Sequence, residues 1–237
     1  MNQRYSGDVI VALDFKNLEE TIAFLAPFSG HDQLYVKVGM ELYLQNGPQV
    51  LSALKERGHR IFLDLKLHDI PNTVYGASKG LAQFKVDMLN FHAAGGKEML
   101  EAAKQGLLDG GSPETLAIAV TQLTSTSQEQ MQAQQLIPVD LATSVRHYAQ
   151  LTKEAGLDGV VASVHEAPLI REACGQDFAI VTPGIRLIGE PSQDQKRIAT
   201  PEVARQLGST HIVVGRPITL ASDPVAVYDG ICQSFLK

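Results

Sequence analysis

Short runs of apolar, often β-branched residues alternate along the chain with longer amphipathic segments. Each run has the length of a buried strand, and Gly, Pro, Thr and Asp at the segment boundaries mark turns and helix ends. The predicted strands span residues 8–15, 35–39, 60–67, 88–93, 115–123, 159–163, 179–185 and 211–218. Because these eight strands alternate with helices and no Gly/Ser-rich or Pro-rich linker interrupts them, we predict a single (β/α)8 TIM barrel spanning residues 1–237 rather than a doubly wound sheet.

The stretch at 61–73, I-F-L-D-L-K-L-H-D-I-P-N-T, has the most informative pattern. Strict alternation predicts a strand on which Asp64 and Lys66 share one face. Pro71 ends the strand and starts a helix, which places Asp69 in the turn between them. Charges are costly to bury unless they are paired, so the stretch indicates a structural ion-pair network, a solvated edge strand or a catalytic site.

In such a barrel the active site lies at the carboxyl ends of the strands. Five charged residues of alternating sign are expected there, namely Asp14, Lys37, Asp64, Lys66 and Asp69. A substrate carboxylate pressed against a fixed carboxylate is repelled, and a neighbouring lysine can stabilise and then protonate the carbanion that is left when CO2 departs. The array therefore favours a decarboxylation.

The ends of strands seven and eight are the usual phosphate site of this fold. Glycine at position 215 leaves backbone N-H groups free to approach an anion, and Arg216 adds a forked cation. For the Gly-Arg-Pro tripeptide taken alone, a turn with a solvated arginine is the favoured interpretation. The polar segment 187–199 is longer than a typical βα loop and is a candidate lid, whose amides at Gln193 or Gln195 are candidates to contact a ligand.

Composition narrows the class of protein further. The chain has 237 residues, of which 44% are hydrophobic and 19% charged, and its net charge of -6 leaves no basic surface for nucleic acid. Cys174 and Cys232 have neither metal-ligand spacing nor a disulfide-rich context, so we expect free thiols and a cytoplasmic location. We expect no signal peptide, because the N-terminal M-N-Q-R-Y-S-G-D lacks an apolar core, and no apolar run is long enough for a membrane span. No flavin, nicotinamide, pyridoxal or metal motif occurs, so no cofactor is expected.

The run D-L-K-L-H-D-I-P-N-T resembles the D-x-K-x-x-D-I-P-x-T signature of the orotidine 5'-phosphate decarboxylase family in its compact bacterial form. Further matches occur in the same order around the barrel: A-L-D, V-K-V-G, T-x-L-T-S, T-P-G-I-R and V-V-G-R-P-I. The resemblance implies conversion of orotidine 5'-monophosphate (OMP) to uridine 5'-monophosphate (UMP) and CO2, the last step of de novo pyrimidine nucleotide synthesis, without metal or organic cofactor.

The same resemblance implies roles for individual residues. Lys66 corresponds to the general acid, Asp64 lies against the substrate carboxylate, and Lys37 and Asp14 bind ribose hydroxyls. Asp69 and Thr73 reach into the site of a neighbouring subunit, which implies a homodimer. The remaining ligand contacts are Ser127 at the pyrimidine, Thr124 at the end of strand five, and Arg186, Gln195, Gly215 and Arg216 around the phosphate.

Two other functions stay open. The 3-keto-gulonate 6-phosphate decarboxylases and hexulose-phosphate synthases are related barrels that use magnesium, but they carry a metal-binding Glu where this chain has Lys37. A barrel that binds a phosphorylated ligand without chemistry is the non-enzyme alternative, and it would be expected to lose the charged array. His68 and His92, which lie beside the array in sequence, are expected to be structural.

Overall fold

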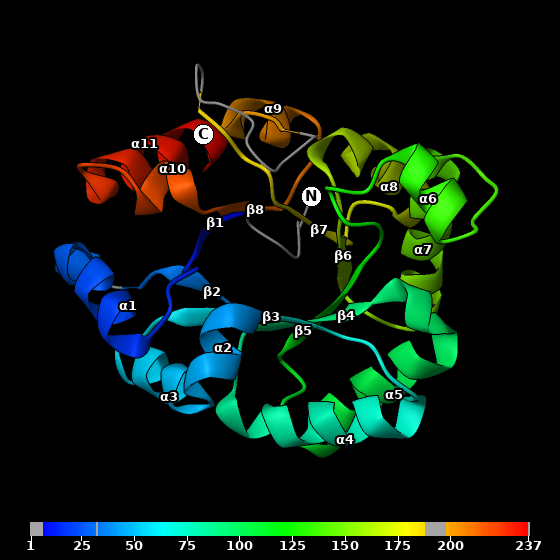
Figure 1. Cartoon of the computed structure of the whole chain (residues 1–237), viewed down its shortest axis with the longest axis horizontal. Coiled ribbons are helices and arrows are strands. Elements are labelled where there is room, and N and C mark those ends of the chain that lie inside the picture. Colours follow the sequence, from blue (N-terminus) through cyan, green and yellow to red (C-terminus); the bar gives the residue numbers. More distant parts are fainter. Residues whose placement is uncertain (1–6, 32, 188–197, 237) are drawn as a thin grey trace.

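The fold is described from a computed structural model over residues 7–31, 33–187 and 198–236. Eight parallel strands form a closed barrel in which each strand pairs with its neighbours in sequence and β1 pairs with β8 (Figure 1). The strands are β1 (Asp8–Ala12), β2 (Tyr35–Gly39), β3 (Arg60–Leu67), β4 (Met88–His92), β5 (Leu116–Val120), β6 (Gly159–Val161), β7 (Ala179–Thr182) and β8 (His211–Val214). The predicted (β/α)8 barrel is confirmed.

Helices surround the strands on the outside of the barrel (Figure 1). They are α1 (Leu18–Leu25), α2 (Met40–Asn46), α3 (Gln49–Glu56), α4 (Pro71–Leu81), α5 (Gly96–Asp109), α6 (Gln128–Gln134), α7 (Leu141–Glu154), α8 (Ala167–Cys174), α9 (Pro201–Gln206), α10 (Arg216–Thr219) and α11 (Pro224–Leu236). Short 3-10 turns are η1 (Ala26–Gly30), η2 (Ala82–Phe84), η3 (Ala93–Gly95) and η4 (Val164–Glu166). None of the helices in the described ranges combines the length and apolar character needed to cross a membrane.

Several helices begin where the sequence predicts. Pro71 is the first residue of α4, and Thr200 caps α9 by accepting a hydrogen bond from the backbone N-H of Val203. Asp223 accepts a hydrogen bond from the backbone N-H of Ala226 at the start of α11. Such side chains satisfy N-H groups that have no partner inside the helix. These starts fix where the chain leaves each strand end and turns back along the barrel.

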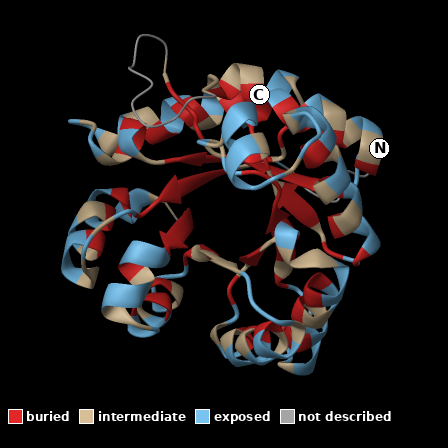
Figure 2. Ribbon diagram, turned by 45° about the vertical axis from the view of Figure 1, so that its right-hand side comes forward, coloured by how far each residue is buried: buried red, intermediate tan, exposed pale blue. Residues whose placement is uncertain are grey.

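Alternation along the strands separates two apolar layers. One face of the strands packs inside the barrel and includes Ile10, Tyr35, Phe62 and Met88. The other face packs against the helices and belongs to the large core cluster. The strands are accordingly buried almost throughout, whereas the helices are exposed on their outer sides (Figure 2). The inward face is the one that carries Lys37 and Asp64 to the barrel mouth, since each lies two residues after an inward-facing aromatic residue.

The amino ends of the strands are fastened by side chains that stand just before even-numbered strands. Asp87, before β4, accepts hydrogen bonds from Lys55 Nζ of α3 at 2.6 Å and from the backbone N-H of Ile61 in β3 at 2.7 Å. Asp158, before β6, likewise accepts from Lys104 Nζ of α5 and from the N-H of Ala117 in β5. Thr210, before β8, accepts from the N-H of Ile180 in β7. These contacts, which we call the base fastenings, lie at the end of the barrel opposite to the site described next.

Candidate active site

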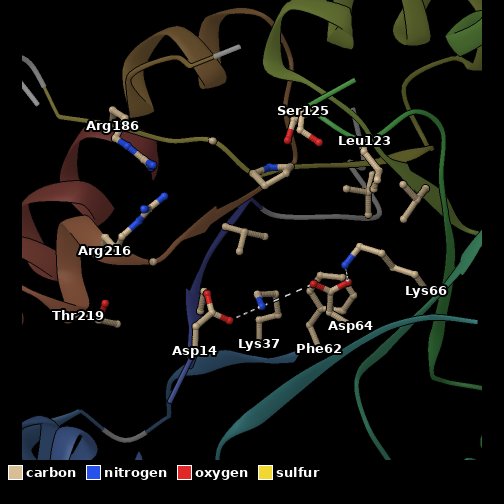
Figure 3. Close-up of a pocket in the computed structure, with 18 of the residues that line it drawn as sticks. Asp14, Lys37, Phe62, Asp64, Lys66, Leu123, Ser125, Arg186, Arg216 and Thr219 are labelled. Carbon is tan, nitrogen blue, oxygen red and sulfur yellow. Dashed lines mark hydrogen bonds and ion pairs between the residues drawn. The ribbon is translucent and has the colours of Figure 1, made fainter. Parts of the chain in front are cut away.

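A cavity of about 800 Å³ opens at the carboxyl ends of the strands. Apolar side chains of the barrel interior line its floor, namely Phe62, Val120, Val161 and Val213. Asp14, Lys37, Asp64 and Lys66 line one side of the cavity, and Arg186 and Arg216 lie together on another (Figure 3). The cavity therefore combines an apolar floor with two separate groups of charges, which suits a ligand with an anionic end and a flat apolar body.

The four predicted charges of strands β1 to β3 form one continuous array. Lys37 Nζ lies 2.9 Å from Asp14 Oδ1 and 3.6 Å from Asp64 Oδ2. Lys66 Nζ lies 2.6 Å from Asp64 Oδ1 (Figure 3). The side chains of Lys37 and Asp64 are only 11% and 13% exposed. Asp64 thus sits between two ammonium groups, and the prediction that Asp64 and Lys66 share a face is confirmed.

Mutual attraction keeps the buried members of the array charged. Burial by itself raises the pKa of a carboxyl group, but the ammonium groups of Lys37 and Lys66 outweigh it and lower the pKa of Asp64 below its usual value. Burial likewise opposes charge on Lys37, but the carboxylates of Asp64 and Asp14 outweigh it and raise the pKa of Lys37. At neutral pH Lys37 and Asp64 therefore both stay charged in a partly desolvated pocket.

Lys66 occupies an unusual backbone conformation within β3. Its φ is +52°, in the left-handed region, although it is not glycine. The pairing of β3 with β4 is also irregular here, because Leu63 pairs with Leu89 and the next pair is Leu67 with Phe91. A left-handed non-glycine residue costs about 1–2 kcal/mol and is typical of functional sites. The sequence alternation predicts a regular strand through this point, and the structure instead has a bulge.

Gly39 at the end of β2 leaves room for the ion pair of Lys37 with Asp14. A β-carbon added at Gly39 would lie 3.0 Å from Lys37 Nζ and 3.5 Å from Asp14 Oδ1. The first of these distances is shorter than a normal contact. The V-K-V-G run therefore favours glycine at position 39 because a larger residue would crowd the ion pair, and not because the backbone needs to be flexible there.

Two arginines form the second group of charges. Arg186 is 7% exposed, donates from Nη1 to the carbonyl oxygen of Ile185 at 2.8 Å, and has a buried Nη2 without a hydrogen-bond partner among the described residues. Arg216 is exposed and lies beside Gly215 on the cavity wall. A buried guanidinium nitrogen of this kind is chemically suited to bind an anionic group.

The ends of the candidate lid segment are held next to Arg186. The backbone N-H of Arg186 donates to the carbonyl oxygen of Ala199 at 3.0 Å, and that of Ala199 donates to Gly184 at 3.3 Å. Residues 188–197, including Gln193 and Gln195, lie outside the described residues. The expected contact of Gln195 with a ligand therefore remains a prediction.

Three predicted site residues do not line the cavity in the described chain. Ser127 caps α6, where its hydroxyl accepts a hydrogen bond from the N-H of Gln130 at 3.2 Å. Ser125, two residues earlier, lines the cavity together with Thr124. Asp69 is exposed in the turn before α4 and accepts a hydrogen bond from the N-H of Ile70 at 2.6 Å, while Thr73 is exposed in the first turn of that helix. The structure thus places a different serine from the predicted one at the cavity.

Sequence reasoning also missed Gln122, which is 3% exposed, lines the cavity and donates to Ser144 Oγ at 3.2 Å. Its position just after β5 was the available signal. His68 and His92 stack with ring centroids 5.4 Å apart and are not among the described residues of the cavity wall. Within the described ranges, no group of three or more His, Cys, Asp or Glu side chains is placed to hold a metal ion.

Comparisons with known proteins bear on the family to which this chain belongs. The family model described as "Orotidine 5'-phosphate decarboxylase / HUMPS family" matches residues 7–231. A curated orotidine 5'-phosphate decarboxylase of Streptococcus thermophilus is 59% identical over 94% of this chain and 94% of its own length. One from Listeria monocytogenes is 57% identical over 95% of this chain and 97% of its own length.

A solved structure of orotidine 5'-phosphate decarboxylase from Lactobacillus acidophilus superposes with a TM-score of 0.88 and 42% identity, covering 98% of this chain and 100% of the other. The family match extends over nearly the whole chain, and the identities lie far above the level at which fold alone is shared. The chain therefore belongs to the orotidine 5'-phosphate decarboxylase family and is a carboxy-lyase.

Proposed function

We propose that the chain converts OMP to UMP and CO2 in de novo pyrimidine synthesis by a cofactor-free mechanism in which Lys66 is the general acid. The observation that carries this proposal is the carboxylate of Asp64 held between Lys37 and Lys66 at the cavity wall, with distances of 3.6 Å and 2.6 Å. This arrangement presents a fixed negative charge and a proton donor side by side. A decarboxylation needs both in the same place.

The charge distribution of the cavity suggests how the nucleotide binds. The phosphate would bind at Arg186 and Arg216, where a buried guanidinium nitrogen has no partner among the described residues. The ribose hydroxyls would bind at Asp14 and Lys37. The pyrimidine would then lie over the apolar floor, with Thr124 and Ser125 at its edge. Ser127 would need a change in the loop before α6 to join them.

The chemistry follows from the charges next to the pyrimidine. The substrate carboxylate at C6 would face the ionised Asp64 and be repelled. As the bond between C6 and the carboxylate carbon breaks, its electron pair stays on C6 and CO2 leaves. The ammonium of Lys66 stabilises the developing carbanion and transfers one proton to C6, which gives UMP and a neutral lysine that regains a proton from water.

Phosphate binding would assist this step from a distance. Because the segment 187–199 begins and ends beside Arg186, ligand contacts there can favour its closure over the cavity, with Gln195 as a further contact. Binding energy at the phosphate would then hold the carboxylate against Asp64. This mechanism predicts that the phosphate contacts affect turnover as well as affinity.

Asp69 and Thr73 would act in a homodimer. Both are exposed in the described chain, and the neighbouring Ile70 is 66% exposed, as are the apolar side chains of Met40 and Leu44 of α2 at 48% and 74%. A homodimer interface over this region would remove these apolar side chains from water. Mixing Lys66→Ala with Asp69→Ala subunits would restore activity in hybrid dimers if Asp69 completes a neighbour's site. No restored activity would contradict the shared site.

The direct test is loss of ultraviolet absorbance of OMP in excess chelator. Wild type and the control Lys97→Ala, which removes an exposed lysine of α5 that pairs with Glu101, should turn the substrate over, whereas Lys66→Ala should not. Activity that disappears on chelation would favour the magnesium-dependent sugar-phosphate enzymes of related barrels. No turnover of OMP by wild type would favour either a magnesium-dependent enzyme with a sugar-phosphate substrate or a barrel that only binds phosphorylated ligands.

The compartment is part of the same proposal. Both cysteines are free thiols, Cys174 buried and Cys232 half-buried. This state is the one expected in the reducing cytoplasm, where nucleotide synthesis takes place.

A further inference from the structure

We propose that Asn90, which does not line the cavity, is the positioning residue that holds Asp64 and Lys66 in their reactive arrangement. The inference rests on the proposed decarboxylation and adds a residue to which neither the sequence pattern nor the family resemblance assigned a role. Asn90 lies in β4 and its side chain is fully buried, with an exposed fraction of 0%. It stands directly behind the part of the cavity wall that Asp64 and Lys66 form.

Both polar atoms of the Asn90 side-chain amide form hydrogen bonds. Its Nδ2 donates to Asp64 Oδ1 at 2.6 Å, and its Oδ1 accepts from the backbone N-H of Lys66 at 2.8 Å. A single side chain therefore binds the carboxylate of one array member and the backbone of another. Since a carboxylate cannot donate and a backbone N-H cannot accept, these two partners fix the orientation of the amide.

The bond to the backbone of Lys66 compensates for the bulge in β3. Residues 64–66 of β3 stand opposite Asn90 alone, because the flanking pairs are Leu63 with Leu89 and Leu67 with Phe91. The N-H of Lys66 is therefore displaced from the regular ladder of parallel strands, and the Asn90 side chain supplies the acceptor that a strand carbonyl would otherwise provide. This bond stabilises the left-handed conformation of Lys66.

The bond to Asp64 orients its carboxylate. Oδ1 of Asp64 receives both the Asn90 amide and the Lys66 ammonium, while Oδ2 faces Lys37 at 3.6 Å. The amide thus decides which oxygen is turned to which lysine. Donation from the amide also favours the ionised form of Asp64, the form that the mechanism requires.

At neutral pH, neither leucine nor aspartate, which are close to asparagine in size, can both donate to Asp64 and accept from Lys66. Leucine has a similar volume but can neither donate to Asp64 nor accept from Lys66. Aspartate has the same shape and can accept from Lys66, but when ionised it repels Asp64. Protonated aspartate can again donate and accept, so Asn90→Asp should recover the function of the amide as the pH falls.

The test compares Asn90→Leu and Asn90→Asp with the control Thr115→Val. Thr115 is 2% exposed at the amino end of β5 and donates to the carbonyl oxygen of Val86 at 2.7 Å, so its substitution also removes a buried hydrogen bond but at the other end of the barrel. For each variant we would measure kcat, KM for OMP, Kd for UMP, the pH profile of kcat and the melting temperature. Activity is assayed at a temperature at which circular dichroism shows the variant to be folded.

We expect Asn90→Leu to lower kcat by about 10- to 100-fold with a Kd for UMP within about threefold of wild type, since the amide acts on the reacting groups rather than on the phosphate or ribose. The kcat of Asn90→Asp should rise relative to wild type as the pH falls. Thr115→Val should lower the melting temperature and leave kcat unchanged.

Three results would overturn the proposal: an unchanged kcat in Asn90→Leu, an Asn90→Asp pH profile parallel to that of wild type, or failure of both variants to fold at any temperature, which would give Asn90 a role in folding alone. Failure of the proposed decarboxylation is seen separately, as absence of OMP turnover by wild type. In that case the φ of Lys66 in a crystal structure of Asn90→Leu still tests the positioning, and an unchanged left-handed φ contradicts it.

Discussion

The substitution Asp64→Asn separates the two effects that the charged array should have on the substrate. It keeps the shape of the side chain but removes the negative charge between Lys37 and Lys66. If Asp64 repels the substrate carboxylate, the substitution should make OMP bind more tightly. UMP has no such carboxylate and should be affected much less. Turnover should fall, because the ground state of the substrate is no longer destabilised.

The size of the effect can be bounded from the geometry. Two carboxylates about 4 Å apart repel each other by about 4 kcal/mol at an effective dielectric constant of about 20. The lysines beside Asp64 offset part of this repulsion, so a lower bound of about 1.4 kcal/mol is reasonable, which is tenfold in affinity. We therefore expect the ratio of OMP to UMP affinity to rise by between about 10-fold and about 1,000-fold.

The affinities are measured by isothermal titration calorimetry in a background that does not consume the substrate. Lys66→Ala and the double variant Lys66→Ala/Asp64→Asn are compared, each with OMP and with UMP. This background also removes the closer of the two cations, at 2.6 Å, so the charge of Asp64 acts with less compensation. An affinity ratio that is unchanged, or that shifts towards UMP, would refute electrostatic repulsion of the substrate by Asp64.

Three further predictions follow from single contacts. Arg216→Ala should lower kcat as well as affinity for OMP, and an unchanged kcat at saturating OMP would contradict the coupling of phosphate binding to chemistry. Gly39→Ala should raise KM by about two- to fivefold, because its β-carbon would crowd Lys37 Nζ at 3.0 Å. The control Gly76→Ala has open space around the new carbon and should leave KM unchanged. Equal KM values for the two variants would refute the steric argument. His211 is buried at the base, where burial and then the charge of Arg60 lower its pKa from 6.5 to about 4. The unfolded chain thus binds a proton that the folded chain does not, so up to about 3 kcal/mol of stability should be lost between pH 6.5 and 4. His211→Gln should flatten this part of the curve in urea unfolding, and an equal slope would contradict the assignment.

The strands were predictable because burial on both faces of a parallel barrel produces short, nearly continuous apolar runs. The predicted ends of the strands are less accurate, because burial does not stop where the strand ladder stops. The prediction 115–123 extends beyond β5 (Leu116–Val120), yet Thr121 and Gln122 are still buried. Side chains at the barrel mouth remain covered by helices and loops after the strand ladder has ended. A pattern that reports burial therefore overestimates strand length.

The charged array was predictable because side chains alternate in direction along each strand, so that inward-facing side chains of neighbouring strands meet at the barrel mouth. The bulge at Lys66 could not be predicted, because the apolar and polar positions of β3 follow the same alternation with or without it. The choice between Ser125 and Ser127 was also beyond sequence reasoning. Both lie in an aperiodic loop, where the path of the backbone decides which hydroxyl faces the cavity and which one caps α6.

The base fastenings have a consequence for how such a chain can be divided and recombined. Each aspartate fastening joins a helix, the strand that follows it and the start of the next strand, as in Lys55, Ile61 and Asp87. A segment of two consecutive strands can therefore carry its own structural attachment when it is moved to another barrel. The cavity, by contrast, takes its lining from six of the eight strands and from the segment that follows β7. The stabilising contacts of this barrel can therefore be transferred with a two-strand segment, whereas the decarboxylase site requires the whole barrel.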